Sequence, residues 1–398
     1  MVFRVIRMSF RTLSFQFIHK LGLAVLVLCL SACIMAPKAP SGIGPALAWQ
    51  AIPGWALDQH ADSLPALLAS CGVLSSRSAN WQNICSEASR IRTEDHQSAR
   101  IFYEQWFSPH AVFDEEGNSE GLLTGYYEPL LYGSRRQSDR YTVPVYAKPK
   151  DLIQVDLGAV YPELKEMRLR GQIVGNRVIP YPDRKQIADT ALPEAEVLVW
   201  LDDPIDLFFL QIQGSGRVAL NDGTSTRLGY ADQNGHPYRA IGRELVERGE
   251  LALDGVSMFS IRDWLDENPD QASAILNTNP SYVFFLENKN SDHGPIGSLN
   301  VPLSAERSLA IDPGVIEPGF PVWVDTSLPA SEAEDAGKAK GVPYQRLMQA
   351  QDTGGAIKGY IRADIFFGAG ERARRLAGLM KQRGKLYVLK PRLLNPEN

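Results

Sequence analysis

Hydrophobic and polar residues recur along this chain with two different periods, and the period changes near residue 113. Between about 61 and 113, apolar residues return every three or four positions, as in SLPALLASCGVL (63–74) and SARIFYEQWFSPHAVF (98–113), which predicts helices. Short β-rich segments broken by Gly and Pro follow, such as GLLTGYYEPLLYGS (121–134) and YTVPVYAKP (141–149). Many short strands with few helices favour β-barrels over a doubly wound sheet, so we expect a mainly β fold.

The later part of the chain continues this alternation of strands and helices. The expected elements are strands with tight turns within 196–220, amphipathic helices over 239–251 and 258–276, strands following 279–287 and over 320–326 and 356–368, a helix over 370–384, and a closing strand over 385–391. The segment 329–341 is polar and rich in small residues, which predicts an exposed loop.

The amino terminus has the layout of a secretory signal. Four cations and no acid precede an apolar run over 21–30, which is too short to span a bilayer. The run ends in Leu-Ser-Ala-Cys, which resembles the lipobox of bacterial lipoproteins and makes Cys33 the expected lipidated residue. We therefore predict a lipoprotein signal peptide over 1–32 and a flexible tether over 33–60, rich in Ala, Pro and Gly. The alternative is an ordinary signal peptide with an unrelated cysteine.

Composition narrows the possible partners. The net charge is −5, and no basic stripe with interleaved aromatic residues is present, so we expect no nucleic acid partner. The six histidines are scattered without ligand spacing, which argues against zinc, and we expect neither a metal nor a cofactor. Beyond the signal and lipobox, Cys71 and Cys85 remain. In an oxidising periplasm they indicate one disulfide, and two free thiols are the alternative.

Acidic residues set among small and apolar residues are the candidates for chemistry. Asp352 lies in DTGGAIKG (352–359), Asp364 in RADIFFG (362–368) and Asp312 in IDPG (311–314). A carboxyl group held beside apolar groups has a raised pKa and can act as a general acid. Asp-Thr-Gly also occurs in aspartic peptidases, but these need two such loops from duplicated lobes. The only other candidate, at Asp325, is too close in sequence to Asp352 to belong to a duplicated lobe.

The order of these three aspartates, within IDPGVIEPGFPVWV (311–324) and DTGGAIKG, resembles the C-terminal three-aspartate (3D) domain of the membrane-bound lytic murein transglycosylase A family. The resemblance implies a double-psi β-barrel made from both chain ends, 61–135 and 279–398. It also implies an inserted, β-rich, glycan-binding domain over 136–278, with a large groove between the two.

The resemblance also implies an activity. The family cleaves the β-1,4 bond between N-acetylmuramic acid and N-acetylglucosamine in peptidoglycan and forms a 1,6-anhydro sugar. Asp364 matches its single general acid and base, and Asp352 a second carboxylate that orients or polarises the site. Asp312, which is followed by Pro313, is expected to be a structural acid. Two alternatives stay open: a hydrolase in which Asp352 or Glu128 activates water, and a wall-binding lipoprotein without turnover.

Two further motifs, at 124–129 and 211–217, match the family and suit a sugar ligand. The first offers aromatic faces, and the second offers amide and hydroxyl groups. Both contain glycines that allow close contact with a sugar. The expected substrate-binding residues are Thr124, Gly125, Tyr126, Tyr127, Gln211, Gln213, Gly214 and Ser215. Without the resemblance, either motif is typical of a core strand followed by a turn. The expected location is the periplasmic face of the outer membrane, anchored through Cys33. Cell-wall synthesis or division proteins are candidate partners.

Overall fold

The computed structural model describes residues 41–164, 167, 169–288, 294–329 and 341–393. The predicted signal peptide and Cys33 therefore lie outside the described residues, as does most of the predicted loop 329–341. Residues 41–398 group as one compact unit. Within the described residues, no helix combines the length and the apolar character that crossing a bilayer requires.

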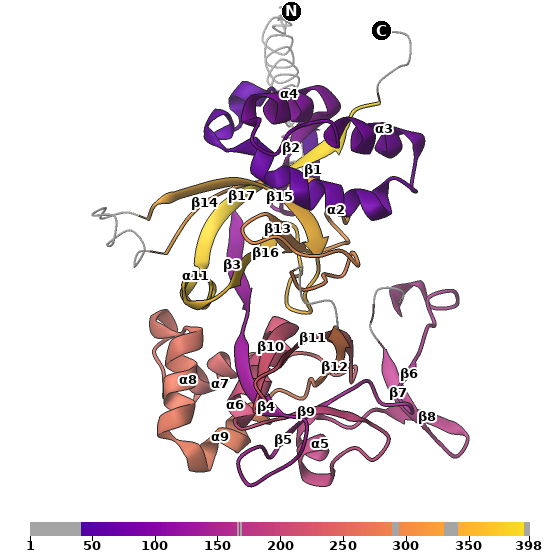
Figure 1. Cartoon of the computed structure of the whole chain (residues 1–398), viewed down its shortest axis with the longest axis vertical. Coiled ribbons are helices and arrows are strands. Elements are labelled where there is room, and N and C mark those ends of the chain that lie inside the picture. The colour runs from indigo at the N-terminus through magenta and orange to yellow at the C-terminus, as the bar shows by residue number, and fades with distance from the viewer. Residues whose placement is uncertain (1–40, 165–166, 168, 289–293, 330–340, 394–398) are drawn as a thin grey trace, which may run out of the picture. The chain divides into compact units, whose positions relative to one another are not determined.

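Most of the described strands belong to two sheets, so the expected mainly β fold is confirmed. The larger, here called the barrel sheet, has the order β1-β2-β17-β14-β15-β13-β16-β3 and an additional pairing between β17 and β3 (Figure 1). That pairing closes β17, β14, β15, β13, β16 and β3 into a ring, in which neighbours pair both parallel and antiparallel. The double-psi topology itself stays a prediction. The strands of the barrel sheet are β1 (Gly42–Ala46), β2 (Phe107–Phe113), β3 (Gly121–Glu128), β13 (Ser308–Ile311), β14 (Pro321–Ser327), β15 (Pro343–Asp352), β16 (Arg362–Ala369) and β17 (Lys381–Pro391).

The smaller sheet, the inserted sheet, has the order β12-β11-β10-β4-β9-β5. It begins directly after β3, with only Pro129 between, and its last strand precedes β13 (Figure 1). It therefore extends beyond the predicted insert of 136–278 at both ends, and the division into two domains stays a prediction. Its strands are β4 (Leu130–Ser134), β5 (Val143–Tyr146), β9 (Val197–Leu201), β10 (Ser215–Leu220), β11 (Ser225–Gln233) and β12 (Val283–Asn288).

Helices and a small third sheet complete the described chain. In the N-terminal part they are η1 (Trp49–Ala51), η2 (Trp55–Leu57), η3 (His60–Ser63), α2 (Leu64–Leu74), α3 (Ala79–Ala88) and α4 (His96–Trp106). The inserted part adds η4 (Pro162–Leu164), α5 (Arg184–Thr190), α6 (Pro204–Gln213), α7 (Ile241–Glu247), η5 (Leu253–Gly255), α8 (Met258–Glu267) and α9 (Pro269–Leu276). The third sheet holds β6 (Ile153–Gln154), β7 (Arg170–Val174) and β8 (Arg177–Pro180), and α11 (Glu371–Leu379) precedes β17.

The predicted tether is wrong for residues 41–60. Strand β1 pairs with β2, and Trp55 is buried against Trp49 and Trp323, with ring centroids 4.4 Å and 5.2 Å apart. Two tryptophans in one short segment bury enough apolar surface to hold it on the barrel, which its Ala, Pro and Gly content concealed.

Three element boundaries also differ from the sequence prediction, each for a local or tertiary reason. Residues 107–113 form strand β2 instead of continuing the helix, because Pro109 has no N–H to donate within a helix. Residues 204–213 form helix α6 instead of a strand, because the Asp203 carboxylate caps it by accepting from the Ile205 N–H at 2.8 Å, with Pro204 at its first position. The last helix ends at Leu379, since residues 381–384 pair with β3 and close the ring.

Candidate active site

Pairing in the barrel sheet brings the two predicted catalytic aspartates to opposite sides of one alanine. Ala310 on β13 pairs with Asp352 on β15 and with Asp364 on β16, and Asp364 pairs in turn with Thr124 on β3. Residues directly opposite on adjacent strands carry their side chains on the same face. The barrel core holds the alternate residues Leu123, Leu309 and Ala363, so Thr124, Ala310 and Asp364 lie on the outer face of the ring. On β15 an irregular register before Asp352 brings its carboxylate to Tyr126 on that same face.

Asp364 has the surroundings of a general acid. It is partly buried, and its Oδ1 accepts a hydrogen bond from the Thr124 hydroxyl at 2.7 Å. Desolvation raises its pKa to about 6, and the nearby Asp352 charge adds to this rise. The Thr124 hydrogen bond and the Arg362 charge act in the opposite direction. The carboxyl group is therefore protonated in mildly acidic solution, where a solvated aspartate is ionised.

Asp352 is held by three donors. Its Oδ2 accepts from the Tyr126 hydroxyl at 2.9 Å, and its Oδ1 accepts from the backbone N–H groups of Ser298 and Thr353, both at 2.9 Å. Burial raises the pKa of Asp352, and these hydrogen bonds oppose that rise. The site thus contains a fixed second carboxylate beside Asp364.

Asp312 is placed as a structural acid. Its Oδ1 accepts from the Gly314 N–H at 3.1 Å and its Oδ2 from the Gly359 N–H at 2.8 Å. It ties the turn after β13 to the turn that leads into β16. This placement favours the structural role expected from the sequence.

The sugar-binding motif on β3 divides between two faces of the strand. Thr124 and Tyr126 contact the two carboxylates, as described above. Gly125 and Tyr127 lie on the other face, where a side chain at Gly125 would come within 2.4 Å of Phe367 and 3.1 Å of Ala377. Close packing therefore explains this glycine without a sugar, and Tyr126, which is buried, is placed to hold Asp352 and not to expose its ring.

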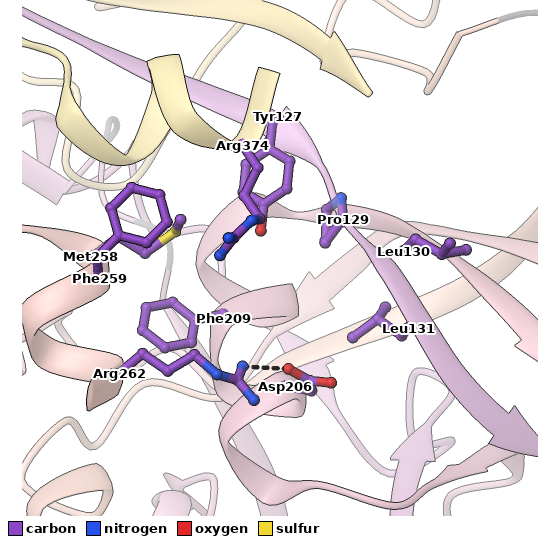
Figure 2. A pocket seen from close by; sticks show the side chains of 10 residues that line it. All are labelled: Tyr127, Pro129, Leu130, Leu131, Asp206, Phe209, Met258, Phe259, Arg262 and Arg374. Carbon is purple, nitrogen blue, oxygen red and sulfur yellow. Dashed lines mark hydrogen bonds and ion pairs between the residues drawn. The ribbon is translucent and has the colours of Figure 1, made fainter. Parts of the chain in front are cut away.

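A pocket of about 210 Å³ lies on that other face of the strand (Figure 2). Phe209, Met258 and Phe259 form much of the apolar part of its wall. Arg262 and Arg374 also line the pocket. Arg262 is paired with Asp203 and Asp206, and Arg374 with Glu371. Of the residues that the structure describes as its lining, none is one of the three aspartates. The pocket is therefore separate from the carboxylate site.

The second motif forms the end of helix α6 and the start of β10. Gln211 is buried and donates to the Val283 carbonyl at 3.2 Å, which favours a structural role. Gln213 accepts from the Tyr127 N–H at 2.9 Å and joins α6 to β3. Gly214 caps the helix at φ 79°, the left-handed conformation that favours glycine, and Ser215 is buried where β10 pairs with β11.

Glu128 is not available as a base. It is buried, and its two oxygens form ion pairs with Arg227 at 2.6 Å and Arg217 at 3.1 Å. A carboxylate with both oxygens held in ion pairs cannot turn toward a water molecule. The hydrolase alternative therefore loses one of its two candidate bases.

The structure contains the predicted disulfide between Cys71 and Cys85, whose Cα atoms are 5.6 Å apart. It joins α2 to α3 in the N-terminal helices, away from the carboxylates in sequence. Of the predicted alternatives, the one with two free thiols is therefore wrong.

Sequence reasoning missed three contributors to the site. Ala310 separates the two acids, the Ser298 N–H supports Asp352, and Arg362 lies two residues before Asp364 on the same face of β16. The alternation of β16 could have indicated Arg362. The other two depend on strand register and on a loop fold that leave no local signal.

A partly buried carboxyl group with a pKa of about 6, beside a second fixed carboxylate on the outer face of a β-barrel, is typical of an acid–base enzyme that cleaves glycosidic bonds. Comparison with known proteins makes this class specific. Residues 122–286 match the MltA specific insert domain, and residues 307–390 match the 3D domain. The chain belongs to the membrane-bound lytic murein transglycosylase A family, as the resemblance predicted.

Relatives with this name and fold cover most of the chain. Membrane-bound lytic murein transglycosylase A of Escherichia coli K12 is 32% identical over 280 residues, which are 70% of this chain and 67% of the relative. The crystal structure of MltA from Neisseria gonorrhoeae has a TM-score of 0.74 and 35% identity, covering 90% of this chain and 98% of its own. E. coli MltA with bound chitohexaose has a TM-score of 0.67 and 26% identity, and the match covers 89% of this chain and 96% of that structure's chain.

Proposed function

We propose that this chain is a lytic transglycosylase. It cleaves the β-1,4 bond between N-acetylmuramic acid and N-acetylglucosamine in peptidoglycan and leaves a 1,6-anhydro-N-acetylmuramic acid end. The observation that carries the proposal is the partly buried Asp364 carboxyl group, whose pKa is raised to about 6 and which lies beside Asp352. The family and the chitohexaose bound to the E. coli relative support the choice of substrate.

The chemistry needs one protonated carboxyl group. Asp364 donates its proton to the glycosidic oxygen as the bond from C1 to that oxygen breaks, and the N-acetylglucosamine leaves with that proton. The Asp364 carboxylate then removes the proton of the C6 hydroxyl, and the C6 oxygen bonds to C1. Asp364 ends the cycle protonated, and no water or protein nucleophile is consumed.

The neighbours of Asp364 hold and tune this group. Thr124 fixes one carboxyl oxygen, which leaves the other to face the substrate. Asp352 raises the pKa of Asp364 through its charge, and its own position is fixed by Tyr126 and two backbone N–H groups. With three donors on its oxygens, Asp352 is poorly placed to activate water, which favours transglycosylation over hydrolysis.

Digestion of purified peptidoglycan tests this proposal. Wild-type protein should release muropeptides lighter by one water than hydrolytic products, and Asp364→Asn should release none. Asp312→Asn is the matched control, since that carboxylate holds a turn and pairs with Lys358, away from Asp352 and Asp364 in its contacts. Products that contain the added water would establish a hydrolase instead. Bound but uncleaved glycan with the wild-type protein would leave a wall-binding protein.

We further propose that Cys33 carries lipid and holds the chain at the periplasmic face of the outer membrane. The disulfide between Cys71 and Cys85 supports an oxidising compartment. Cys33→Ser should abolish incorporation of labelled palmitate and move the protein to the soluble periplasmic fraction. Palmitate incorporation that survives this substitution would contradict the proposal.

A further inference from the structure

Two cations flank Asp364 on the outer face of the barrel sheet. Arg362 precedes it by two residues on β16, so both side chains lie on the same face, about 7 Å apart along the strand. Lys381 on β17 pairs with Thr124, which pairs on its other side with Asp364. Lys381 is therefore two strand spacings, about 10 Å, from Asp364 on that face.

Among the described residues neither cation forms an ion pair, and the carboxylate whose charge acts on Arg362 is that of Asp364. The Arg362 guanidinium is half-buried and donates to the Ala363 carbonyl at 2.6 Å, and Lys381 is exposed without an ion pair. Neighbouring cations are engaged elsewhere: Arg383 donates to the Glu120 carbonyl at 2.6 Å, and Lys358 lies 3.6 Å from Asp312.

The protonation state of Asp364 decides whether the positive charge of Arg362 is balanced. The acid must be neutral before it can donate a proton, and in that state it provides no counter-charge for the guanidinium beside it. A half-buried cation without a counter-charge is costly, so an anion from the ligand would be bound favourably there. The chain as a whole is acidic, with a net charge of −5, so this basic pair is a local feature.

We infer that Arg362 and Lys381 recognise a carboxylate of the muramic acid residue at the cleaved bond, an inference that rests on the proposed function. N-acetylglucosamine carries no carboxyl group, whereas the lactyl ether of muramic acid ends in one. In peptide-free strands this lactyl carboxylate is free. In peptide-bearing strands it is bonded to the peptide, and carboxylates of the peptide are the source. The pair thus distinguishes muramic acid from neutral amino sugars.

Binding measurements by calorimetry test this inference in the full-length Asp364→Asn protein, which mimics the neutral acid and does not turn over. The ligands are neutral chitohexaose, peptide-free glycan strands and peptide-bearing glycan strands. Arg362→Gln and Lys381→Gln, each added to Asp364→Asn, should weaken binding of an anionic strand by about tenfold and of chitohexaose by less than about twofold.

Controls separate recognition from folding and net charge. Arg362→Lys keeps the cation and should retain most of the preference for anionic strands. Lys185→Gln removes one positive charge from a residue already paired with Asp189, and should change none of the three affinities. Higher ionic strength should reduce the anionic preference and leave chitohexaose binding unchanged.

Loss confined to peptide-free strands would support the lactyl carboxylate as the ligand, and loss confined to peptide-bearing strands would support the peptide. Equal loss for chitohexaose, or no loss for any ligand, would overturn the inference. The proposed function fails separately, if the wild-type protein forms no anhydro product, so the two failures are distinguishable.

Discussion

Asp364→Asn should make the protein more stable at neutral pH while removing its activity. In the folded protein the pKa of Asp364 is raised from the ordinary 3.8 to about 6, chiefly by desolvation. At about 1.4 kcal/mol for each pH unit, ionisation of this group costs the folded state about 3 kcal/mol more than the unfolded chain. Asparagine has the same shape, can still accept from Thr124 at Oδ1, and does not ionise.

The sign of the pH dependence follows from proton binding. The folded protein binds this proton more tightly than the unfolded chain, so the stabilisation is complete below about pH 4 and is lost as the pH rises through about 6. Urea unfolding at pH 4 and pH 7.5 should show the variant gaining about 2.5 kcal/mol on the wild type between the two conditions, because the unfolded carboxyl group is already partly ionised at pH 4.

A control tests whether the effect belongs to Asp364. Asp312→Asn removes a carboxylate that accepts two backbone N–H groups, and should give no gain in stability at pH 7.5. An equal difference between wild type and Asp364→Asn at both pH values would refute the raised pKa and the role built on it.

Three further changes test separate parts of the structure. Thr124→Val removes a hydrogen bond that favours the ionised form of Asp364, so the pKa of Asp364 should rise. The pH profile of kcat/KM measures this pKa, and a profile unchanged from the wild type would contradict the prediction. Replacing Cys71 and Cys85 by serine should lower the free energy of unfolding by about 3 kcal/mol, and a reductant should then lower the Tm of the wild type alone. Glu128→Gln removes the buried negative charge that pairs with Arg227 and Arg217 and should cost about 3 kcal/mol in urea unfolding, whereas a neutral effect would mean that this ion pair is dispensable.

The chemistry of the site was visible in the sequence because it depends on local surroundings. Asp352 and Asp364 each lie within small or apolar neighbours, and burial raises the pKa of both, as that pattern predicts. Their juxtaposition was not visible from composition or periodicity, because it depends on Ala310, a residue more than 40 positions earlier, pairing with both strands. The family resemblance implied that both aspartates belong to one site, which the residues alone could not show.

Errors in the fold prediction have physical causes. The apolar run at 204–213 satisfies either a buried strand or a buried helix, and the Asp203 cap together with Pro204 decides for the helix. Residues 381–384 follow a helix without a strong local stop, and their pairing with β3 is a tertiary contact. The same dependence on register explains why Lys381 was not predicted at the site.

The source of the oxygen at C1 of the released muramic acid tests the central claim most directly. Peptidoglycan should be digested in isotopically labelled water, and the muramic acid ends analysed by mass spectrometry. A transglycosylase that uses only Asp364 joins C1 to the substrate's own C6 oxygen, so we predict anhydro ends without label. Labelled, reducing muramic acid ends would contradict the account and show that a water molecule, activated by another group, completes the reaction.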